Sequence, residues 1–149
     1  MTTVSFLKKK TEVFECFKIY KELVKNETDL KIKCLRSDNG GEFTSKVFQQ
    51  YCDENGIKGK FSIARTRQEN GVVERKNKTI QEMAKTMLND SKLDDKFWVQ
   101  AIDTAILIIN RGFLRNNCNM NPYKLLKGRP TNIKYFKIFG SKCYIKRED

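Results

Sequence analysis

Apolar residues recur at strand and helix spacings along most of the chain, and the two periods alternate. Residues 4–7 form a short run typical of a strand, and apolar positions repeat every three or four residues through 13–24, which predicts an amphipathic helix. The next strand is expected over 32–35, and Asp38 follows at its carboxyl end, where Asn39-Gly40-Gly41 breaks the strand. This strand, helix and strand pattern presents a carboxylate at the edge of a sheet.

The middle of the chain predicts two further helices and a strand. A short helix is expected over 45–54, stopped by an Asn-Gly pair, and a brief strand over 57–63. Residues 64–70 are expected to form a polar loop. A long helix then opens near Asn70, because one stripe of its surface is apolar and another is charged. Glu74 is expected in about the first turn of this helix, pointing away from the core.

The last third of the chain predicts one strongly apolar helix and a small closing region. The helix over 94–110 is so apolar that either the core or another subunit must cover it. Phe97 and Trp98 near its start belong either to that core or to a platform on which bases stack. A short helix is expected near 122–126, followed by a turn and a closing strand through 139–144.

Composition and charge narrow the class of protein. The chain has 149 residues, of which 39% are hydrophobic, which is enough for one domain with a core. Lys and Arg number 30 against 18 Asp and Glu, and the net charge of +12 favours nucleic acid as the partner. The five cysteines have no paired spacing, so we expect reduced core thiols rather than disulfides or zinc ligands. The first ten residues do not have the charge order of a signal peptide, and we expect an intracellular protein.

Two polar motifs carry the candidate chemistry. One is Ser37-Asp38-Asn39-Gly40-Gly41-Glu42-Phe43, the other is Asn70-Gly71-Val72-Val73-Glu74-Arg75-Lys76-Asn77, and thirty-five residues separate Asp38 from Glu74. Taken singly, such an Asp is usually a turn former and such a Glu usually complements a helix dipole. Together, an acid at a strand end and an acid on a later helix can converge on divalent metal ions and drive phosphoryl transfer on DNA. We predict that Asp38 and Glu74 are catalytic metal ligands, while Glu42 is either a third acid nearby or serves a salt bridge or loop contact.

Basic residues gather around the second motif. Seven of them outnumber the acids Glu69 and Glu74 in this stretch: Lys58, Lys60, Arg65, Arg67, Arg75, Lys76 and Lys78. Such a run is either a solvated face or a surface that binds DNA. We favour phosphate contacts through Arg67, Arg75, Lys76 and Lys78, since Lys78 lies one helical turn from Glu74. Contacts of this kind imply no sequence specificity and a steep dependence of affinity on salt.

These residues resemble the integrase catalytic core of copia-type long-terminal-repeat retrotransposons, which is part of a Pol polyprotein. The segments that match, besides the two motifs, are Leu7-Lys8-Lys9-Lys10, Asn110-Arg111, Pro122-Tyr123 and Ile138-Phe139-Gly140. The resemblance implies a ribonuclease-H-like α/β fold and an Asp, Asp, Glu triad in which Asp38 is the second acid and Glu74 the third. It also implies Mg²⁺ or Mn²⁺ as cofactor, the ends of the element and target DNA as partners, and 3′-end processing and strand transfer as the reaction.

The chain also departs from the family pattern. The first Asp of the triad would lie upstream of the Lys8-Lys9-Lys10 region, so we expect an incomplete sheet that lacks the first strands, and self-association through the uncovered edge. We expect a truncated core over 1–115 and a C-terminal extension over 116–149 that ends in a strand. Alone, the chain is expected to bind metal weakly or not at all and to be inactive. The alternatives are a non-catalytic module for nucleic-acid binding or assembly, and a metal-dependent nuclease of the same fold; a functional integrase would work in the nucleus.

Overall fold

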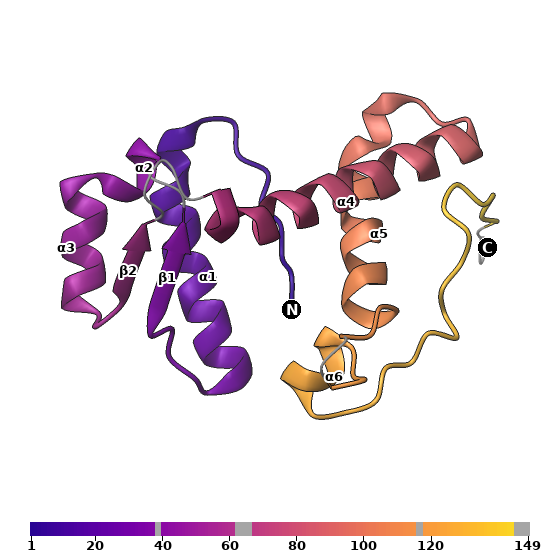
Figure 1. Cartoon of the computed structure of the whole chain (residues 1–149). Coiled ribbons are helices and arrows are strands. Elements are labelled where there is room, and N and C mark those ends of the chain that lie inside the picture. Colours follow the sequence, from indigo (N-terminus) through magenta and orange to yellow (C-terminus); the bar gives the residue numbers. More distant parts are fainter. Residues whose placement is uncertain (38–39, 62–66, 116–117, 145–149) are drawn as a thin grey trace, which may run out of the picture. The chain divides into compact units, whose positions relative to one another are not determined.

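The computed structural model describes residues 1–37, 40–61, 67–115 and 118–144, with the backbone alone at 61 and 67–70. The chain divides into two compact units: Ser5–Arg75 forms one, and Met1–Val4 together with Lys76–Asp149 forms the other. Helix α4 (Arg67–Ser91) runs from the first unit into the second (Figure 1). Each unit has its own buried cluster of apolar side chains.

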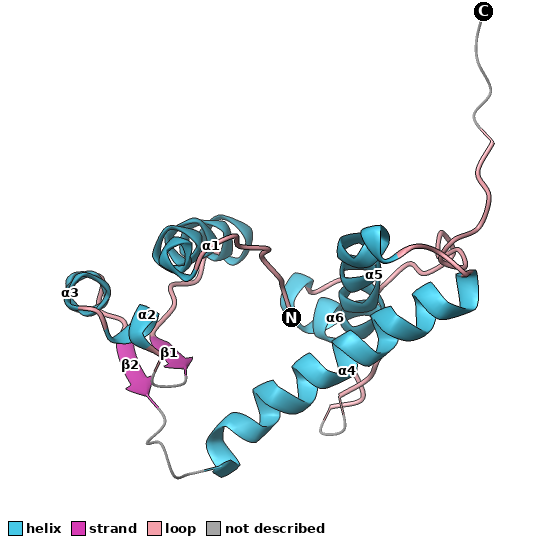
Figure 2. Ribbon diagram, turned by 90° about the horizontal axis from the view of Figure 1, so that it is seen from above, coloured by secondary structure: helices cyan, strands magenta, loops and turns pink. Residues whose placement is uncertain are grey.

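The Ser5–Arg75 unit alternates helices with two short strands. Its elements before α4 are η1 (Lys10–Glu12), α1 (Val13–Thr28), β1 (Cys34–Ser37), α2 (Gly41–Thr44), α3 (Lys46–Glu54) and β2 (Lys58–Phe61). The strands pair in parallel, from Cys34 opposite Lys58 to Ser37 opposite Phe61. Parallel strands need a crossover connection, and α2 and α3 supply it. Helices α1 and α3 lie on the same side of the sheet (Figure 2).

Phe48 on α3 is the centre of this unit's core. Its side chain is fully buried, and its ring centroid lies 5.2 Å from that of Phe17 and 5.5 Å from those of Phe14 and Phe43. These three partners come from α1 and α2, so one aromatic cluster joins three helices. Leu35 of β1 packs against the same cluster. The core therefore fixes the strand that leads into the first motif.

The other unit is built on two packed helices. Its elements after α4 are η2 (Asp95–Phe97), α5 (Trp98–Arg111) and α6 (Pro122–Lys127). Ala84 of α4 and both Ala101 and Ala105 of α5 have no exposed surface, and side chains this small allow two helices to approach closely. The side chain of Asn110 holds the amino-terminal segment, since it accepts a hydrogen bond from the Thr2 N–H at 2.8 Å and donates one to the Thr2 carbonyl at 2.6 Å.

Most of the predicted helices are confirmed. The helices expected over 13–24, 45–54 and 122–126 are present as α1, α3 and α6, and the strands expected over 32–35 and 57–63 as β1 and β2. The apolar helix is covered by α4 of the same chain, which favours the core interpretation over a subunit contact. Phe97 and Trp98 also pack against that cluster, as core residues do. None of the described helices combines the length and apolar character needed to cross a membrane.

Two predicted strands are absent from the described residues, the one over 4–7 and the closing one over 139–144. A strand exists only through hydrogen bonds to a neighbour, and within the described part of the chain β1 and β2 pair with each other alone. Phe6 and Leu7 are exposed instead, and Phe139 packs against the α4–α5 cluster as part of an irregular segment. The division of the chain after residue 115 stays a prediction.

Two further expectations were wrong. Helix α4 begins at Arg67 rather than near Asn70, because Arg, Gln and Glu favour helix and no proline stops it, so Glu74 lies in its third turn. The cysteines are not all core thiols either: Cys52 is buried, whereas Cys34, Cys118 and Cys143 are exposed. The exposure of Cys34 follows from strand alternation, because its neighbour Leu35 takes the covered side of the sheet.

Candidate metal and nucleic-acid site

The first candidate acid, Asp38, lies with Asn39 outside the described residues, but the elements on either side are placed. Ser37 ends β1, and Gly40 begins the next turn, where its carbonyl accepts hydrogen bonds from the Phe43 N–H at 3.0 Å and the Thr44 N–H at 3.2 Å. The predicted break after the strand is therefore confirmed. In chain order, Asp38 directly follows the carboxyl end of a parallel strand, where α/β proteins commonly place ligand-binding groups.

The second candidate acid, Glu74, is exposed on α4. An exposed carboxylate can turn toward a metal ion without breaking a contact in the core. Carboxylate oxygen suits Mg²⁺ and Mn²⁺, and Mg²⁺ is commonly held by one or two carboxylates together with substrate phosphates. Within the described residues no three His, Cys, Asp or Glu side chains gather in a way that could hold a metal. The predicted pair, Asp38 and Glu74, would supply carboxylate oxygens of the kind that suits the ion, and their joint role stays a prediction.

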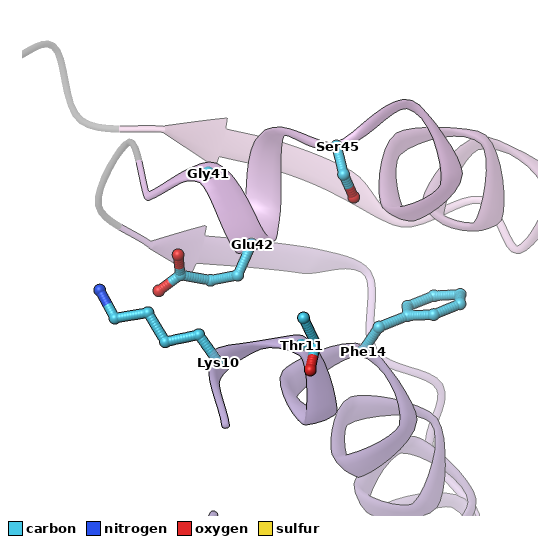
Figure 3. Close-up of a pocket in the computed structure, with 6 residues that line it drawn as sticks. All are labelled: Lys10, Thr11, Phe14, Gly41, Glu42 and Ser45. Carbon is cyan, nitrogen blue, oxygen red and sulfur yellow. The ribbon is translucent and has the colours of Figure 1, made fainter. Parts of the chain in front are cut away.

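Glu42, the other acid of the first motif, lines a pocket in the Ser5–Arg75 unit. The pocket encloses about 410 Å³ and is lined by Lys10, Thr11, Phe14, Gly41, Glu42 and Ser45. Figure 3 shows the side chains of Lys10 and Glu42 pointing toward each other across it. The carboxyl group of Glu42 also lies against Gly40, where an added Cβ would come within 2.9 Å of its Cδ. Glu42 thus makes a loop contact, which is one of the roles expected for it.

Two of the four predicted DNA contacts lie in the Ser5–Arg75 unit, on the first turns of α4. The side chain of Arg67 is outside what the structure describes. The guanidinium of Arg75 lies against Gly71, where an added Cβ would be 3.1 Å from its Nη1. The absence of a side chain at Gly71 therefore leaves room for Arg75 to lie along the helix surface.

The other two, Lys76 and Lys78, are exposed on α4. The Lys78 ammonium lies 3.8 Å from the carboxylate of Glu82, and because these side chains are 76% and 64% exposed the pair contributes at most about 0.5 kcal/mol. Burial, and after it the positive charges of Lys76 and Arg115, lower the pKa of the Met1 amino group. Burial penalises a charge of either sign, whereas the positive charges of Lys76 and Arg115 favour an anion.

Sequence reasoning missed one cation, Arg36 of β1. The parallel pairing sets it directly opposite Lys60 of β2, and both side chains are exposed. Strand alternation alone could have predicted that Arg36 faces away from Leu35. The neighbouring position of Lys60 depends on the register between two segments more than twenty residues apart, which the sequence did not reveal.

Comparison with known proteins places the chain among the products of transposable elements. It is 39% identical over 141 residues, 95% of its length, to the retrovirus-related Pol polyprotein from transposon TNT 1-94 of Nicotiana tabacum. It is 37% identical over 138 residues, 93% of its length, to the corresponding polyprotein from transposon RE2 of Arabidopsis thaliana. This chain belongs to the retrovirus-related Pol polyproteins. It spans 11% and 9% of the length of these two relatives, so the similarity concerns one segment of each polyprotein.

The fold identifies which segment of a Pol polyprotein this is. The chain aligns with the HTLV-2 integrase catalytic core domain in complex with magnesium, in its trimeric form, with a TM-score of 0.60 and 25% identity. The alignment covers 83% of this chain and 74% of that one. No family model matches the chain. The predicted ribonuclease-H-like α/β fold with an incomplete sheet is confirmed, and this segment of the Pol polyprotein has the fold of an integrase core.

Proposed function

We propose that this integrase core comes from a copia-type retrotransposon and that its role is DNA integration. The reaction would be 3′-end processing of the element's DNA and joining of the 3′ hydroxyls to target DNA, in the nucleus. The observation that carries the proposal is the 39% identity over 95% of the chain to a retrotransposon Pol polyprotein. The two acidic motifs support it, because they supply carboxylates of the kind that phosphoryl transfer on DNA requires.

The chain's own contribution to this chemistry would be to hold metal and DNA. Asp38 and Glu74 would be the ligands of Mg²⁺ or Mn²⁺, and the magnesium bound by the HTLV-2 core supports this choice of ion. Bound metal would supply activation of the attacking oxygen and stabilisation of the leaving oxygen. Arg75, Lys76 and Lys78 would neutralise backbone phosphates, which positions the DNA but does not read its sequence.

The 149-residue chain on its own is expected to be inactive in strand transfer. Two of the three acids of the integrase triad match positions in this sequence, Asp38 and Glu74. Two-metal phosphoryl transfer needs the ions held at a fixed spacing with their charge neutralised, and two carboxylates do this less well than three. We therefore expect weak binding of divalent metal and no joining of DNA ends.

Metal binding and strand transfer can be measured separately on the purified chain. Calorimetry with Mn²⁺ is expected to show weak binding that Asp38→Asn and Glu74→Gln each abolish. Glu82→Gln is the matched control, since it removes another exposed acid of the same helix. If both motif variants bind Mn²⁺ as the unaltered chain does, Asp38 and Glu74 are not its ligands and the proposed metal site is refuted. Metal-dependent joining of labelled DNA ends, lost in Glu74→Gln, would show that the isolated chain is active after all.

The second candidate is a non-catalytic module for nucleic-acid binding or assembly, which would act as a homo-oligomer, as the trimeric form of the HTLV-2 core does. It is favoured by the net charge of +12 and by the exposed lysines of α4. In that case Asp38→Asn would leave every activity intact, while Lys76→Glu combined with Lys78→Glu would weaken DNA binding. A metal-dependent nuclease would instead cut DNA without joining it.

A further inference from the structure

The β1–β2 sheet has one covered face and one bare face within the Ser5–Arg75 unit. Helices α1 and α3 lie on one side of it (Figure 2), and Leu35 packs into the core on that side. Successive side chains of a strand point to opposite faces, so Cys34 and Arg36 belong to the other face. Both are exposed, whereas Leu35 and Ser37 are half-buried. The exposure of Cys34 and Arg36 shows that this other face is open.

The register of the sheet adds two lysines to this face. Lys58 is the partner of Cys34, and Lys60 is the partner of Arg36. Residues directly opposite each other in paired strands share a face, and Lys58 and Lys60 are both exposed. Three of the four positions on the bare face are therefore cations. We call Cys34, Arg36, Lys58 and Lys60 the basic sheet face.

The three cations stand close together, and no acid of the described residues forms a salt bridge with them. Paired strands lie about 4.8 Å apart, and alternate residues of one strand about 6.6 Å apart. Like charges directly opposite each other destabilise a sheet, and Arg36 and Lys60 are such a pair. Among the salt bridges of the described residues, none involves Arg36, Lys58 or Lys60. A bound polyanion would relieve this repulsion.

We propose that the basic sheet face binds the phosphate backbone of DNA. The inference rests on the proposed function in taking DNA as the partner, and it adds a site apart from the cations of α4. The face offers no exposed large apolar side chain that could enter a membrane. Arg36 and Lys60 stand near the carboxyl ends of the strands, and Asp38 comes two residues after Arg36. DNA bound to this face would therefore lie next to the end of β1 from which the first motif begins.

The competing explanation is that these cations only keep the sheet edge from pairing with other chains, a common use of lysine on short strands. Measurement of DNA affinity by fluorescence anisotropy at several salt concentrations separates the two explanations. Each phosphate contact contributes about 0.9 to the slope of log affinity against log salt. For the triple variant Arg36→Gln, Lys58→Gln and Lys60→Gln, we expect the slope to fall by up to about 2.7.

The matched control replaces three exposed lysines of the same unit that lie outside the sheet, Lys9→Gln, Lys25→Gln and Lys46→Gln. It changes the net charge equally, so a general effect of charge would appear in both triples. A slope that falls no further in the sheet triple than in the control overturns the proposal. If Lys76→Gln with Lys78→Gln still lowers the slope in that case, the proposed DNA-binding function stands without this site. If the unaltered chain does not bind DNA at all, both the basic sheet face as a DNA site and the proposed DNA-binding function are refuted.

Cys34 allows a second test on the unaltered chain, which does not depend on the triple variant folding. It lies on the basic sheet face, opposite Lys58, and is exposed. Bound DNA is expected to slow its alkylation by iodoacetamide several-fold, measured by mass spectrometry. Cys118 and Cys143 are exposed in the other unit and serve as internal controls. Equal alkylation rates of Cys34 with and without bound DNA would overturn the proposal.

Discussion

Replacing Phe48 by alanine is expected to destabilise strongly the unit that carries the first motif. Phe48 has no exposed surface, and its ring contacts those of Phe14, Phe17 and Phe43 at centroid distances of 5.2 to 5.5 Å. These partners come from α1 and α2, so the alanine leaves a cavity where three helices meet. Because Leu35 of β1 packs against the same cluster, the loss also loosens the strand that precedes Asp38.

The expected cost is large compared with the stability of the unit. Phe→Ala at a buried site costs about 3–5 kcal/mol, which includes the cavity left behind. A unit of about 70 residues, at roughly 0.05–0.15 kcal/mol per residue, has a total stability of about 4–10 kcal/mol. The substitution therefore removes about a third of the stability if the unit is as stable as about 10 kcal/mol, and all of it if the unit has only about 4 kcal/mol. Where the loss is complete and the unit unfolds, the basic sheet face would lose its DNA affinity with it.

Hydrogen exchange measured peptide by peptide resolves the effect within this unit. A loss of 3–5 kcal/mol corresponds to exchange faster by roughly a hundredfold to a few thousandfold in α3 and β2. Val47→Ala is the matched control, because Val47 is the preceding residue of the same helix and is 64% exposed, so its truncation should cost no more than about 0.5 kcal/mol. If Phe48→Ala accelerates exchange no more than Val47→Ala, the aromatic cluster is not the core of this unit.

Three further predictions concern the two cores and one helix cap. Leu88→Ala, in the α4–α5 cluster, should cost about 3 kcal/mol in urea unfolding followed by the fluorescence of Trp98, the single tryptophan, whereas exposed Leu107→Ala should shift the curve little. Ser45→Ala should cost about 1 kcal/mol by chemical denaturation, because its side chain accepts a hydrogen bond from the first turn of α3; a neutral effect would show that the cap contributes nothing. Burial, and after it the charge of Asp53, raise the pKa of the Cys52 thiol, so stability contributed by the neutral thiol should be lost as the pH rises through that raised pKa, and a Cys52→Ala variant should lack this alkaline loss in its melting curves.

The helices were predictable because the signals that make them are local. Apolar spacing gave α1 and α3, and Ser45 caps α3 with a hydrogen bond to the N–H three residues later. The carboxyl end of α3, at Glu54, is set by the Asn55-Gly56 pair that comes after it, since Gly56 has a φ of 65° that favours glycine. Each of these signals involves residues within one or two helical turns of each other, so each can be recognised in a short stretch of sequence.

The strands were predictable only where a partner strand exists. The run over 4–7 is β-prone in sequence, yet it forms no strand among the described residues, because pairing depends on a second segment. The same reasoning explains why Arg36 was missed: its exposure follows from alternation, but its neighbour Lys60 follows from the register of β1 and β2. Candidate DNA contacts that lie along one helix were easier to recognise than those assembled from two strands.

The position of Glu74 was predictable despite a wrong helix start, because the phase of a helix is set by its buried stripe and not by its first residue. Ile80, Ala84 and Leu88 are buried at spacings of four residues, whereas Glu74, six residues before Ile80 and so about 120° from it around the helix at 100° per residue, is exposed. Moving the start from Asn70 to Arg67 adds a turn without rotating the acid toward the core. Helix α5 has 14 residues against 25 in α4, so at about 1.5 Å per residue it can cover only the carboxyl-terminal part of α4. The buried stripe of α4 comes from its carboxyl-terminal part, and the exposed residues proposed to hold metal and DNA, Glu74, Lys76 and Lys78, lie before that stripe.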